Sequence, residues 1–377
     1  MLQILEGLFQ FCGELGASDI LIMVNQPPRF RVQGKLSPRP DLAEFNSKTV
    51  DEIAMELGLT TLPVGCPDGT ERVRKTLLRE GSIDGAISAP DGARYRFNIF
   101  RENQHTAIAL RRLESSFHTL AELGLPRAVA NFCSERDGLV IVTGPTGSGK
   151  STTLAALIDG INATHEDFII TIEDPIEFLH TSQRSLVNQR QVGRDARSFN
   201  DALVEALRQD PDVILVGEIR DLETMRTAIR AAETGHLVFT TLHAGDCAGA
   251  IERFVGVFPP DEQNSVRHQL AMVLRGILAQ HLVPSTDGSR RWAVTELLVN
   301  TPGIANQIAT GRTSQIPQPS RPAAIWGCAH LKTPSPLFCG GDASPNGPRW
   351  RSPATPRLSV GASMPNKPII EEPDAPI

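Results

Sequence analysis

The stretch that most constrains this chain is the nine-residue sequence GPTGSGKST at Gly144–Thr152. It matches the phosphate-loop pattern Gly-x-x-x-x-Gly-Lys-Ser. The apolar, β-branched run Leu139–Thr143 before it and the helix-forming stretch Ser151–Ile161 after it supply the strand and helix that the pattern requires. In such a loop, backbone N–H groups converge on phosphate oxygens, and the dipole of the following helix adds to the field. The sequence therefore predicts a nucleoside triphosphate site.

The residue types in the loop have separate expected roles. Lys150 would reach the β- and γ-phosphates, and the Ser151 hydroxyl would hold Mg²⁺. The alternative is a glycine-rich turn that matches by accident, which nine consecutive fitting residues in the right context disfavour. The residues expected to contact ATP are Gly144, Pro145, Thr146, Gly147, Ser148, Gly149, Lys150, Ser151 and Thr152.

Length and charge bound the possible functions. The 377 residues are enough for two or three domains at roughly 100–200 residues per domain. A net charge of −6 and a pI near 5.9 argue against a protein whose main task is to grip a nucleic-acid backbone, because that needs clustered Lys and Arg. No nucleic-acid partner is expected.

The cysteines and the N-terminus point to the cytoplasm. The six cysteines form no Cys-x-x-Cys pair and no zinc-ligand spacing, which favours reduced thiols in the cytosol. The start of the chain, MLQILEGLFQFCGEL, has no basic residue and so lacks the charged start of a secretion signal. No apolar run approaches the roughly 18 residues needed to span a bilayer. Any membrane association is expected to go through a partner or a surface.

Residues 1–112 predict a small α+β module. Apolar residues recur at helical spacing near the start, and β-branched or alternating runs bounded by turn residues mark strands. A linker over 113–126 would join this module to the next domain. The predicted helices are 2–15, 47–57 and 71–79, and the predicted strands are 19–24, 30–32, 83–88, 94–100 and 106–112.

From Leu139 onward strands and helices alternate, which is typical of a parallel sheet covered on both faces. The expected fold class is α/β, with a nucleotide-binding domain over 127–312. Ser198 and Asp221 are expected helix N-caps. The predicted strands are 139–143, 168–172, 213–216, 237–241 and 292–299, and the predicted helices are 151–161, 198–209, 221–233, 247–257 and 261–281.

The last part of the chain has a different composition. Of the 28 prolines, 13 lie in residues 314–377, and no helical or strand period survives there. This composition predicts a disordered tail over 313–377.

Hydrolysis of ATP needs a positioned water, a metal ion and cations that neutralise charge on the γ-phosphoryl group. Glu218 follows the apolar strand VILVG and is the candidate for polarising the water, whereas Gly217 stands where an aspartate is usual. Mg²⁺ would then be held by the loop serine, phosphates and water. Glu173 and Asp174 end the neighbouring strand and could share the water or the metal shell. The structural alternatives are an ion pair between Glu218 and Arg220, and helix capping or loop anchoring by the strand-end acids.

Two histidines and a set of arginines are further candidates. His243 ends a strand on the expected ligand side of the sheet, where an imidazole could donate to the γ-phosphate, and His236 lies at the preceding helix-to-strand turn. A lone histidine is more often a structural residue. An arginine supplied by another subunit can speed phosphoryl transfer, although a solvated strand face is the alternative. The arginines considered are Arg94, Arg96, Arg101, Arg111 and Arg112.

Taken together, these segments resemble the PilT-like retraction ATPases of type IV pili, a branch of the secretion-ATPase superfamily. The resemblance runs over residues 2–301. It is carried by GASDI, PPRFRVQGKL, RYRFNIF, GPTGSGKST, TIEDPIEF, QVGRD, ALRQDPDVILVGEIRDLETM and AAETGHLVFTTLHAGDCAGAIERFVGVFP.

The resemblance implies a PAS-like N-terminal domain linked to a RecA-like ATPase domain. It implies a ring-shaped hexamer with ATP between domains and subunits, which would drive a platform protein at the inner membrane and extract pilin subunits. Such a protein would lie in the cytoplasm, at the inner face of the membrane. The residues that match family positions are Gly144–Thr152 (Walker A), Glu173 and Asp174 (acidic box), Glu218 (Walker B glutamate), His236 and His243 (His box), and Arg94, Arg96 and Arg111 (N-domain arginines).

One departure from this branch lies near the end of the resemblance. Retraction ATPases usually show an AIRNLIRE-like segment that couples hydrolysis to retraction, whereas this chain has GIANQIATG at Gly303–Gly311. From about Ser314 the family's C-terminal helices are not recognisable. The hypothesis is a tail that is out of frame relative to its relatives, or newly acquired.

Three alternative functions stay open. A pilus-extension or type II secretion ATPase usually carries a four-cysteine insertion after the His box, where this chain has only Cys247. A non-hydrolysing, ATP-binding subunit of such a ring is suggested by Gly217 and the altered C-terminal part. A nucleic-acid translocase is disfavoured by the acidic balance.

Overall fold

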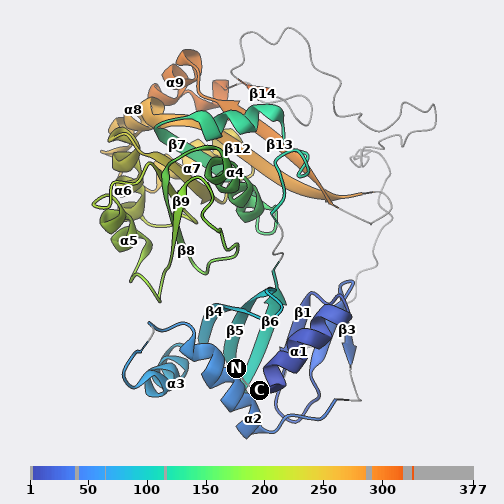
Figure 1. The fold of residues 1–377 in the computed structure, drawn as a ribbon. Coiled ribbons are helices and arrows are strands. Elements are labelled where there is room, and N and C mark those ends of the chain that lie inside the picture. The colour runs from blue at the N-terminus through green and yellow to red at the C-terminus, as the bar shows by residue number, and fades with distance from the viewer. Residues whose placement is uncertain are drawn as a thin grey trace, which may run out of the picture. The chain divides into compact units, whose positions relative to one another are not determined.

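The computed structural model describes residues 3–38, 42–63, 65–113, 117–285, 291–316 and 325–326. The described strands form two sheets, one of six strands and one of eight (Figure 1). The first is antiparallel and packed with helices, and the second is mostly parallel. The predicted fold class, an α+β part followed by an α/β part, is confirmed.

The six-stranded sheet has the order β3-β2-β1-β6-β5-β4. One apolar core joins it to three helices, and ring stacking of Phe9 on Tyr95, with centroids 4.3 Å apart, lies inside that core. All the predicted helices and strands of this part are present, and β3 was not predicted. The strands are β1 (Asp19–Ile22), β2 (Arg29–Val32), β3 (Lys35–Pro38), β4 (Ser82–Ser88), β5 (Arg94–Glu102) and β6 (His105–Arg112), and the helices are α1 (Gln3–Glu14), α2 (Ser47–Leu59) and α3 (Gly69–Glu80).

The eight-stranded sheet has the order β14-β13-β12-β7-β11-β10-β8-β9, and every neighbouring pair is parallel except β12 with β13. The strands are β7 (Gly138–Thr143), β8 (Phe168–Glu173), β9 (Leu186–Gln191), β10 (Val213–Val216), β11 (Leu237–Leu242), β12 (Leu274–Pro284), β13 (Arg291–Val299) and β14 (Ile325–Trp326). The helical elements are η1 (Arg127–Ser134), α4 (Lys150–Thr164), α5 (Phe199–Ala206), α6 (Leu222–Glu233), α7 (Cys247–Gly256), α8 (Gln263–Val273), α9 (Pro302–Ala309) and η2 (Thr313–Gln315).

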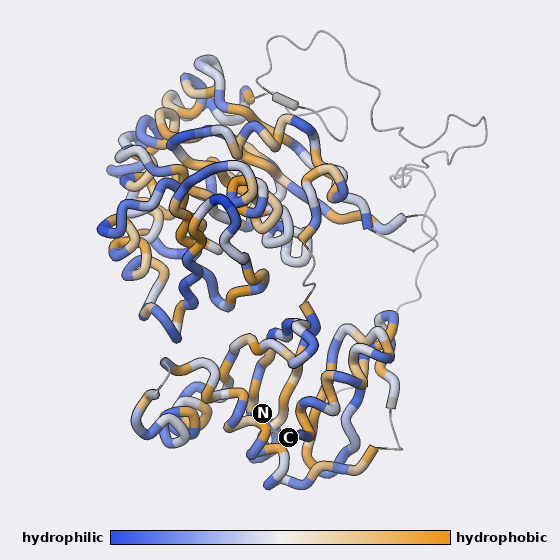
Figure 2. Tube along the Cα trace, in the orientation of Figure 1, coloured by the Kyte–Doolittle hydropathy of each residue, from blue (hydrophilic) through white to orange (hydrophobic). Residues whose placement is uncertain are grey.

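Helices cover both faces of this sheet because its central strands are apolar on both sides. In β7, Leu139 and Ile141 pack into a core with α5 to α9, whereas Val140 and Val142 pack into a second core with α4 and η1. Figure 2 shows hydrophobic residues along these inner strands and hydrophilic residues on the outer turns of the helices. A strand buried on both faces reads as a continuous apolar run, which is why the sequence pattern found β7, β10 and β11.

The helix predicted over 261–281 is wrong in its second half. Helix α8 ends at Val273, and Leu274–Pro284 is the strand β12, inserted between β7 and β13. Residues 274 and 276–279 are almost fully buried between the two cores. A continuous apolar run is compatible with a buried helix or a buried strand, and sheet pairing decided between them.

Several other boundaries differ from the prediction. Ser198 and Asp221 cap their helices as expected, accepting from the N–H groups of Asp201 and Thr224. Helix α5 nevertheless ends at Ala206 rather than near Gln209. Strand β9 and helix α9 were not predicted.

The predicted disordered tail lies almost wholly outside the described residues. Within it the structure shows the turn η2 and the two-residue strand β14, which pairs with Leu297 and Leu298 of β13. In the described part of the chain, no helix is long and apolar enough to cross a membrane.

Candidate functional site

The phosphate loop joins the buried strand β7 to helix α4, as predicted. Three of its glycines have positive φ angles: Gly144 at 149°, Gly147 at 76° and Gly149 at 88°. A Cβ at Gly144 would lie 2.2 Å from the carbonyl oxygen of Gln280, so a side chain is excluded there. The crest of the loop, Pro145–Gly147, is exposed, whereas Ser148 and Lys150 are buried. The loop thus presents its backbone outward from a fixed base.

Lys150 is folded back over the loop. Its Nζ donates hydrogen bonds to the carbonyl oxygens of Gly144 and Pro145, both at 3.0 Å. Burial lowers the pKa of the Lys150 ammonium, and the carboxylates of Glu218 and Glu177 oppose that shift. Carbonyl oxygens are weaker partners for an ammonium than phosphate oxygens are, so a bound phosphate would replace them.

The hydroxyl groups of the loop fit a phosphate-bound cation. Ser151 is exposed at the first turn of α4, and Thr152 is half-buried. Ser148 Oγ is buried and has no hydrogen-bond partner, which leaves it as a donor for a bound anion. Among the described residues, no three His, Cys, Asp or Glu side chains converge to hold a metal ion. A divalent cation here would depend on a hydroxyl, phosphate oxygens and water, which are oxygen ligands that Mg²⁺ accepts.

Glu218 and His243 meet at the carboxyl edge of the sheet, beside the phosphate loop. Strands β10 and β11 are parallel and in register, so the residues after them lie side by side. His243 Nε2 lies 4.0 Å from Glu218 Oε2, and Arg220 Nη2 lies 2.8 Å from the same oxygen. Burial and Lys150 lower the pKa of the His243 imidazole, so it is neutral at pH 7. The predicted functional position of Glu218 and its alternative ion pair with Arg220 therefore coexist.

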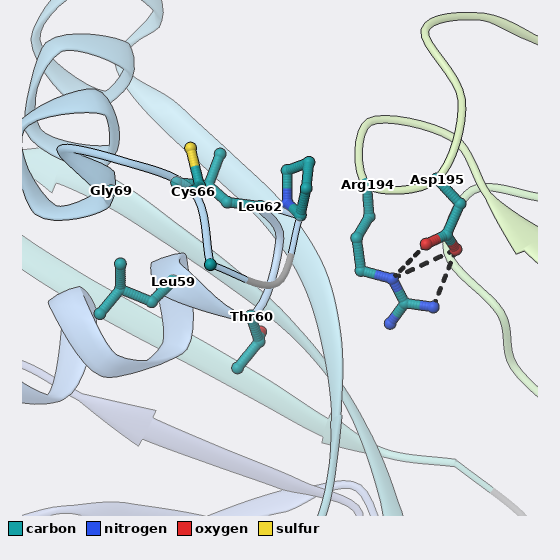
Figure 3. Close-up of a pocket in the computed structure, with 9 residues that line it drawn as sticks. Leu59, Thr60, Leu62, Cys66, Gly69, Arg194 and Asp195 are labelled. Atoms are coloured by element: carbon teal, nitrogen blue, oxygen red, sulfur yellow. Dashed lines mark hydrogen bonds and ion pairs between the residues drawn. The ribbon is translucent and has the colours of Figure 1, made fainter.

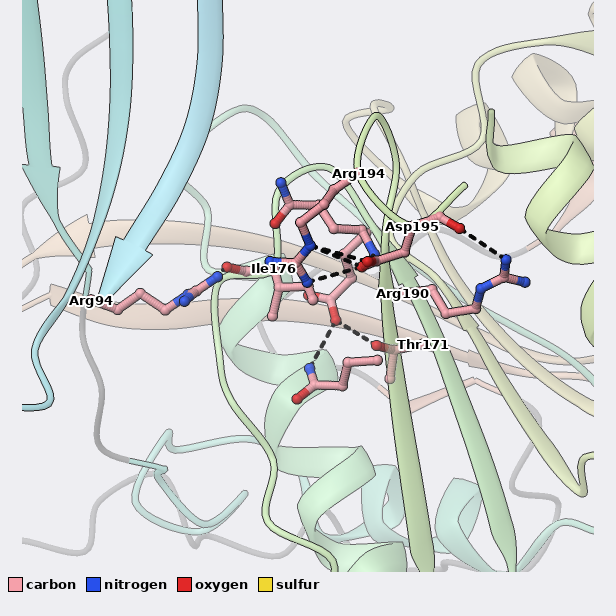
Figure 4. Close-up of polar contacts among 9 residues, drawn as sticks. Arg94, Thr171, Ile176, Arg190, Arg194 and Asp195 are labelled. Carbon is pink, nitrogen blue, oxygen red and sulfur yellow. Dashed lines mark hydrogen bonds and ion pairs between the residues drawn. The ribbon is translucent and has the colours of Figure 1, made fainter. Parts of the chain in front are cut away.

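The acidic pair at the end of β8, Glu173 and Asp174, is partly engaged. Glu173 Oε1 accepts hydrogen bonds from Thr171 Oγ1 at 2.6 Å and from Gln189 Nε2 at 3.2 Å (Figure 4). Burial raises the pKa of the Glu173 carboxyl, and these hydrogen bonds oppose the shift. Burial also raises the pKa of the Asp174 carboxyl, which Arg96 opposes. Glu173 is held in place by its own sheet, which is the anchoring role given as the alternative.

His236 lies at the other edge of the sheet. His236 precedes β11, whose first residue, Leu237, pairs with Gly138 and whose last residue, Leu242, pairs with Thr143. The phosphate loop follows Thr143, so the full length of β11 separates His236 from the loop. Six strand residues span about 20 Å. His236 Nδ1 lies 3.0 Å from the carbonyl oxygen of Ala231. Within one chain His236 does not reach the phosphate loop, so its predicted contact with the nucleotide would have to come from a neighbouring subunit.

The three N-domain arginines have different environments. Arg94 is buried, donating from Nε to the carbonyl oxygen of Ile176 at 2.8 Å (Figure 4) and from Nη1 to Ser88 Oγ at 3.1 Å. The solvated face that the sequence left as the alternative is therefore not found at Arg94, which is bound by these two partners. Arg111 Nε lies 2.8 Å from Asp19 Oδ1. Arg96 and Arg111 are both exposed, but Arg111 is already paired with Asp19, so Arg96 is the arginine of the three most available to an outside ligand.

A pocket of about 460 Å³ lies apart from the phosphate loop. The segment between α2 and α3 lines it together with Arg194 and Asp195, whose side chains form an ion pair with Nη2 and Oδ2 2.9 Å apart (Figure 3). No residue of the phosphate loop contributes to it. The phosphate-loop site is thus a surface at the sheet edge rather than this pocket.

Comparison with known proteins decides the family. Residues 86–324 match the family described as "Type II/IV secretion system protein". The chain belongs to this family. The PilT-like resemblance is confirmed by relatives that match most of the chain, and the chain is an ATPase of this family.

The type IV pilus retractation ATPase PilT of Pseudomonas aeruginosa is 41% identical over 309 residues, which cover 82% of this chain and 86% of that protein. The uncharacterized protein YggR of Escherichia coli is 42% identical over 301 residues, which cover 80% and 87%. The crystal structure of the pilus retraction motor PilT with bound ADP matches with a TM-score of 0.76 at 42% identity, over 84% of this chain and 88% of that one. The PAS-like and RecA-like fold class is confirmed by this match.

Secretion-family motifs did not reveal every polar residue beside the loop. Gln280 Oε1 accepts a hydrogen bond from Thr153 Oγ1 at 2.8 Å, and both side chains are buried. Thr143 Oγ1 accepts from the N–H of Ala244 at 2.8 Å, which ties the loop after β11 to the end of β7. The available signal for Gln280 was one amide within an apolar run, and it was lost because that run was interpreted as a helix.

Proposed function

We propose that this chain is a subunit of a hexameric motor that couples ATP hydrolysis to retraction of type IV pili and so to twitching motility. The observation that carries the proposal is the grouping of Lys150, Glu218 and His243 at one edge of the parallel sheet, in a chain 41% identical to a pilus retractation ATPase over most of its length. These are a phosphate-binding cation, an acid and an imidazole at one place.

Binding begins at the phosphate loop. The ammonium of Lys150 exchanges two loop carbonyls for phosphate oxygens, and the N–H groups at the start of α4 point at the same anion. The Ser151 hydroxyl would hold Mg²⁺, which when bound neutralises charge on the phosphates. The buried Ser148 hydroxyl is a further donor within the loop.

Glu218 is the residue proposed to orient the attacking water. Glu218 forms an ion pair with Arg220, whose side chain is 74% exposed. Ion pairs with exposed partners contribute little to stability. The carboxylate is therefore free to turn toward a water. The neutral imidazole of His243, within 4.0 Å, can donate one hydrogen bond to the γ-phosphate or to that water.

The proposal places Arg96, on the face of β5 opposite the apolar core, against the nucleotide of a neighbouring subunit. Arg96 is exposed, whereas Arg94 and Arg111 already have partners in the chain. A cation supplied in this way stabilises charge in the transition state only when the ring is assembled. His236 could act only in the same intersubunit manner.

The wider assembly is also part of the proposal. Residues 1–112 would form the PAS-like domain, 113–126 the linker and 127–312 the ATPase domain. The ring would act in the cytoplasm on an inner-membrane platform protein, at the inner face of the membrane.

Helix α9 gives one reason to propose weakened coupling to the pilus. Aligned with AIRNLIRE, it keeps the two isoleucines, Ile304 and Ile308, which are 6% and 0% exposed. The two arginines of the pattern are replaced by Ala305 and Ala309, which are half-buried beside them. The helix thus keeps the two buried isoleucines but not the charged side chains. The second candidate function is an ATPase of this ring that turns over without efficient retraction.

The test measures Mg²⁺-dependent phosphate release per subunit over a range of protein concentrations, with Lys150→Ala as the blank. Specific activity that rises with concentration and then saturates supports shared sites in a ring. Rescue of twitching in a strain without its retraction ATPase tests the pilus role. The double variant Ala305→Arg, Ala309→Arg is compared with the unsubstituted chain. If both hydrolyse ATP equally but only the double variant rescues twitching, the second candidate holds. Binding without turnover contradicts both.

A further inference from the structure

A buried glutamine, Gln280, lies directly beneath the phosphate loop. In β12, Ala279 pairs with Thr143 of β7, so Gln280 comes alongside Gly144, the first residue of the loop. Its side chain is 3% exposed. The preceding residues Ile277–Ala279 are apolar and buried, and an amide in such a place costs desolvation that an apolar side chain would not.

Gln280 touches the loop near both ends. The backbone carbonyl oxygen of Gln280 occupies the space next to Gly144, where a Cβ on that glycine would approach it to 2.2 Å. Its side-chain Nε2 lies next to Gly149, where a Cβ would approach it to 2.9 Å. The two glycines that the loop needs at these positions therefore have the same neighbour.

The third contact ties Gln280 to the helix that follows the loop. Its Oε1 accepts a hydrogen bond of 2.8 Å from Thr153 Oγ1, and Thr153 is fully buried. The N–H of Thr153 in turn donates to the carbonyl oxygen of Gly149 at 3.0 Å. The pair thus fixes the first turn of α4, whose free N–H groups are the ones that face a bound phosphate.

We propose that Gln280 is a positioning residue that holds the phosphate loop in its nucleotide-binding shape. The inference rests on the proposed ATP site and adds a residue outside the loop that sets its affinity. Without the amide the loop would sample other shapes, and the apparent Kd would rise by the reciprocal of the binding-competent fraction.

Two substitutions separate the hydrogen bond from the packing. Gln280→Met keeps an unbranched side chain of similar length, and Thr153→Val keeps a β-branched shape, while each removes one partner of the bond. We expect each to raise the Kd for ATP and for ADP about tenfold, and the double variant to be no weaker than either single one. Thr153→Ser keeps the donor and is the matched control, with a Kd close to that of the unchanged chain.

The readout distinguishes positioning from a general structural role. Titration calorimetry gives the Kd, steady-state kinetics should show a raised KM with kcat within about twofold, and thermal unfolding reports stability. A lower melting temperature with an unchanged Kd for both variants overturns the proposal. If Gln280→Met does not fold, Thr153→Val alone decides in the same way.

The same experiment keeps this inference apart from the proposed function. An unchanged chain that does not bind ATP, or Lys150→Ala that binds it equally well, overturns the ATP site itself. An unchanged chain that binds ATP together with variants that bind it equally well overturns only the role of Gln280.

Discussion

Glu218 is a residue whose two neighbours suggest opposite roles. The ion pair with Arg220 could be purely structural, and the approach to His243 could be catalytic. The two roles predict different effects of substitution. Removal of a water-orienting group slows the chemical step, whereas loss of a largely exposed ion pair changes stability by about 0–1 kcal/mol.

We therefore expect Glu218→Gln to lower ATP turnover by about 10²–10⁴ while ATP binding is retained. The measurement is phosphate release at saturating ATP, with nucleotide binding measured in parallel. Arg220→Gln is the matched control, since it breaks the same ion pair and should keep turnover within about fivefold. Equal losses in the two variants would assign Glu218 a structural role.

His180 is a residue whose burial links stability to pH. Its ring lies against that of Phe117 in a tilted arrangement, with centroids 4.7 Å apart, and its Nδ1 is buried without a hydrogen-bond partner. Burial lowers the pKa of this imidazole to about 4. The folded state therefore resists protonation, whereas the unfolded chain takes up a proton near its ordinary value of 6.5.

Because the folded pKa is depressed, the associated stability is present above about pH 6.5 and is lost as the pH falls toward 4. We expect the His180 contribution to fall by about 2 kcal/mol between pH 7 and pH 5. His180→Phe keeps an aromatic ring against Phe117 and removes the titrating group, so its free energy of unfolding in urea should fall less over that interval. His105→Gln, at an exposed histidine, should leave the pH dependence unchanged. The idea fails if His180→Phe has the same pH dependence as the unchanged chain.

Single residues also show where sequence patterns stop being informative about the site. Glu218 and His243 could be placed because residues that end parallel strands share one edge of the sheet. His236 lies where the sequence places it, at the turn between α6 and β11, and its part in nucleotide binding stays a prediction. Arg94 follows the alternation that predicts an outward face, yet the carbonyl of Ile176 covers it. That contact joins residues 82 positions apart, so no local pattern contains it.

At the scale of elements, the sequence predicts best those whose signals are local. The strand before the phosphate loop, the glycines of the loop and the caps of α5 and α6 all depend on neighbouring residues. Strand β12 is the opposite case. Its apolar run fits a helix equally well, and only pairing with β7 and β13 makes it a strand.

The position of β12 depends on a glycine. A Cβ at Gly276 would approach Phe132 Cζ to 2.4 Å and the carbonyl oxygen of Leu298 to 2.7 Å. Phe132 belongs to η1 and Leu298 to β13, so β12 packs closely against both elements at Gly276. A larger residue would have to move a backbone oxygen as well as an aromatic ring.

We expect Gly276→Ala to destabilise the folded chain by about 1–3 kcal/mol, because overpacking forces the strand away from its neighbours. The measurement is the free energy of unfolding in urea. Gly303→Ala in α9 is the control: its nearest neighbour, Thr301 Oγ1, is 4.0 Å away, and alanine favours a helix. It should be neutral or slightly stabilising. A neutral Gly276→Ala would show that β12 can shift without cost.

At the scale of the whole molecule, the question is whether one chain contains a complete site. The phosphate loop, Glu218 and His243 belong to the eight-stranded sheet, whereas Arg96 belongs to the six-stranded one. An exposed arginine contributes to hydrolysis only if it reaches a phosphate, in its own chain or in a neighbour. The two possibilities differ in what happens when two inactive variants are mixed.

Arg96→Ala removes the proposed finger, and Glu218→Gln removes the water-orienting acid. If the two residues act across a subunit boundary, an equimolar mixture of the variants contains some boundaries where both are intact, about a quarter for random assembly of a ring. We expect each variant alone to be nearly inactive and the mixture, after subunit exchange, to regain about that fraction of the turnover. A chain that carries both substitutions, assayed alone, is the inactive control.

If both residues act within one chain, every chain in the mixture lacks one of them and no activity returns. A mixture as inactive as its components, with ring formation verified by its mass in solution, would therefore assign Arg96 to its own subunit's nucleotide. Recovery in the mixture would instead show that a chain with all the phosphate-binding residues needs a neighbour to hydrolyse ATP. That requirement would make turnover depend on assembly, which a motor needs if hydrolysis is to move subunits against one another.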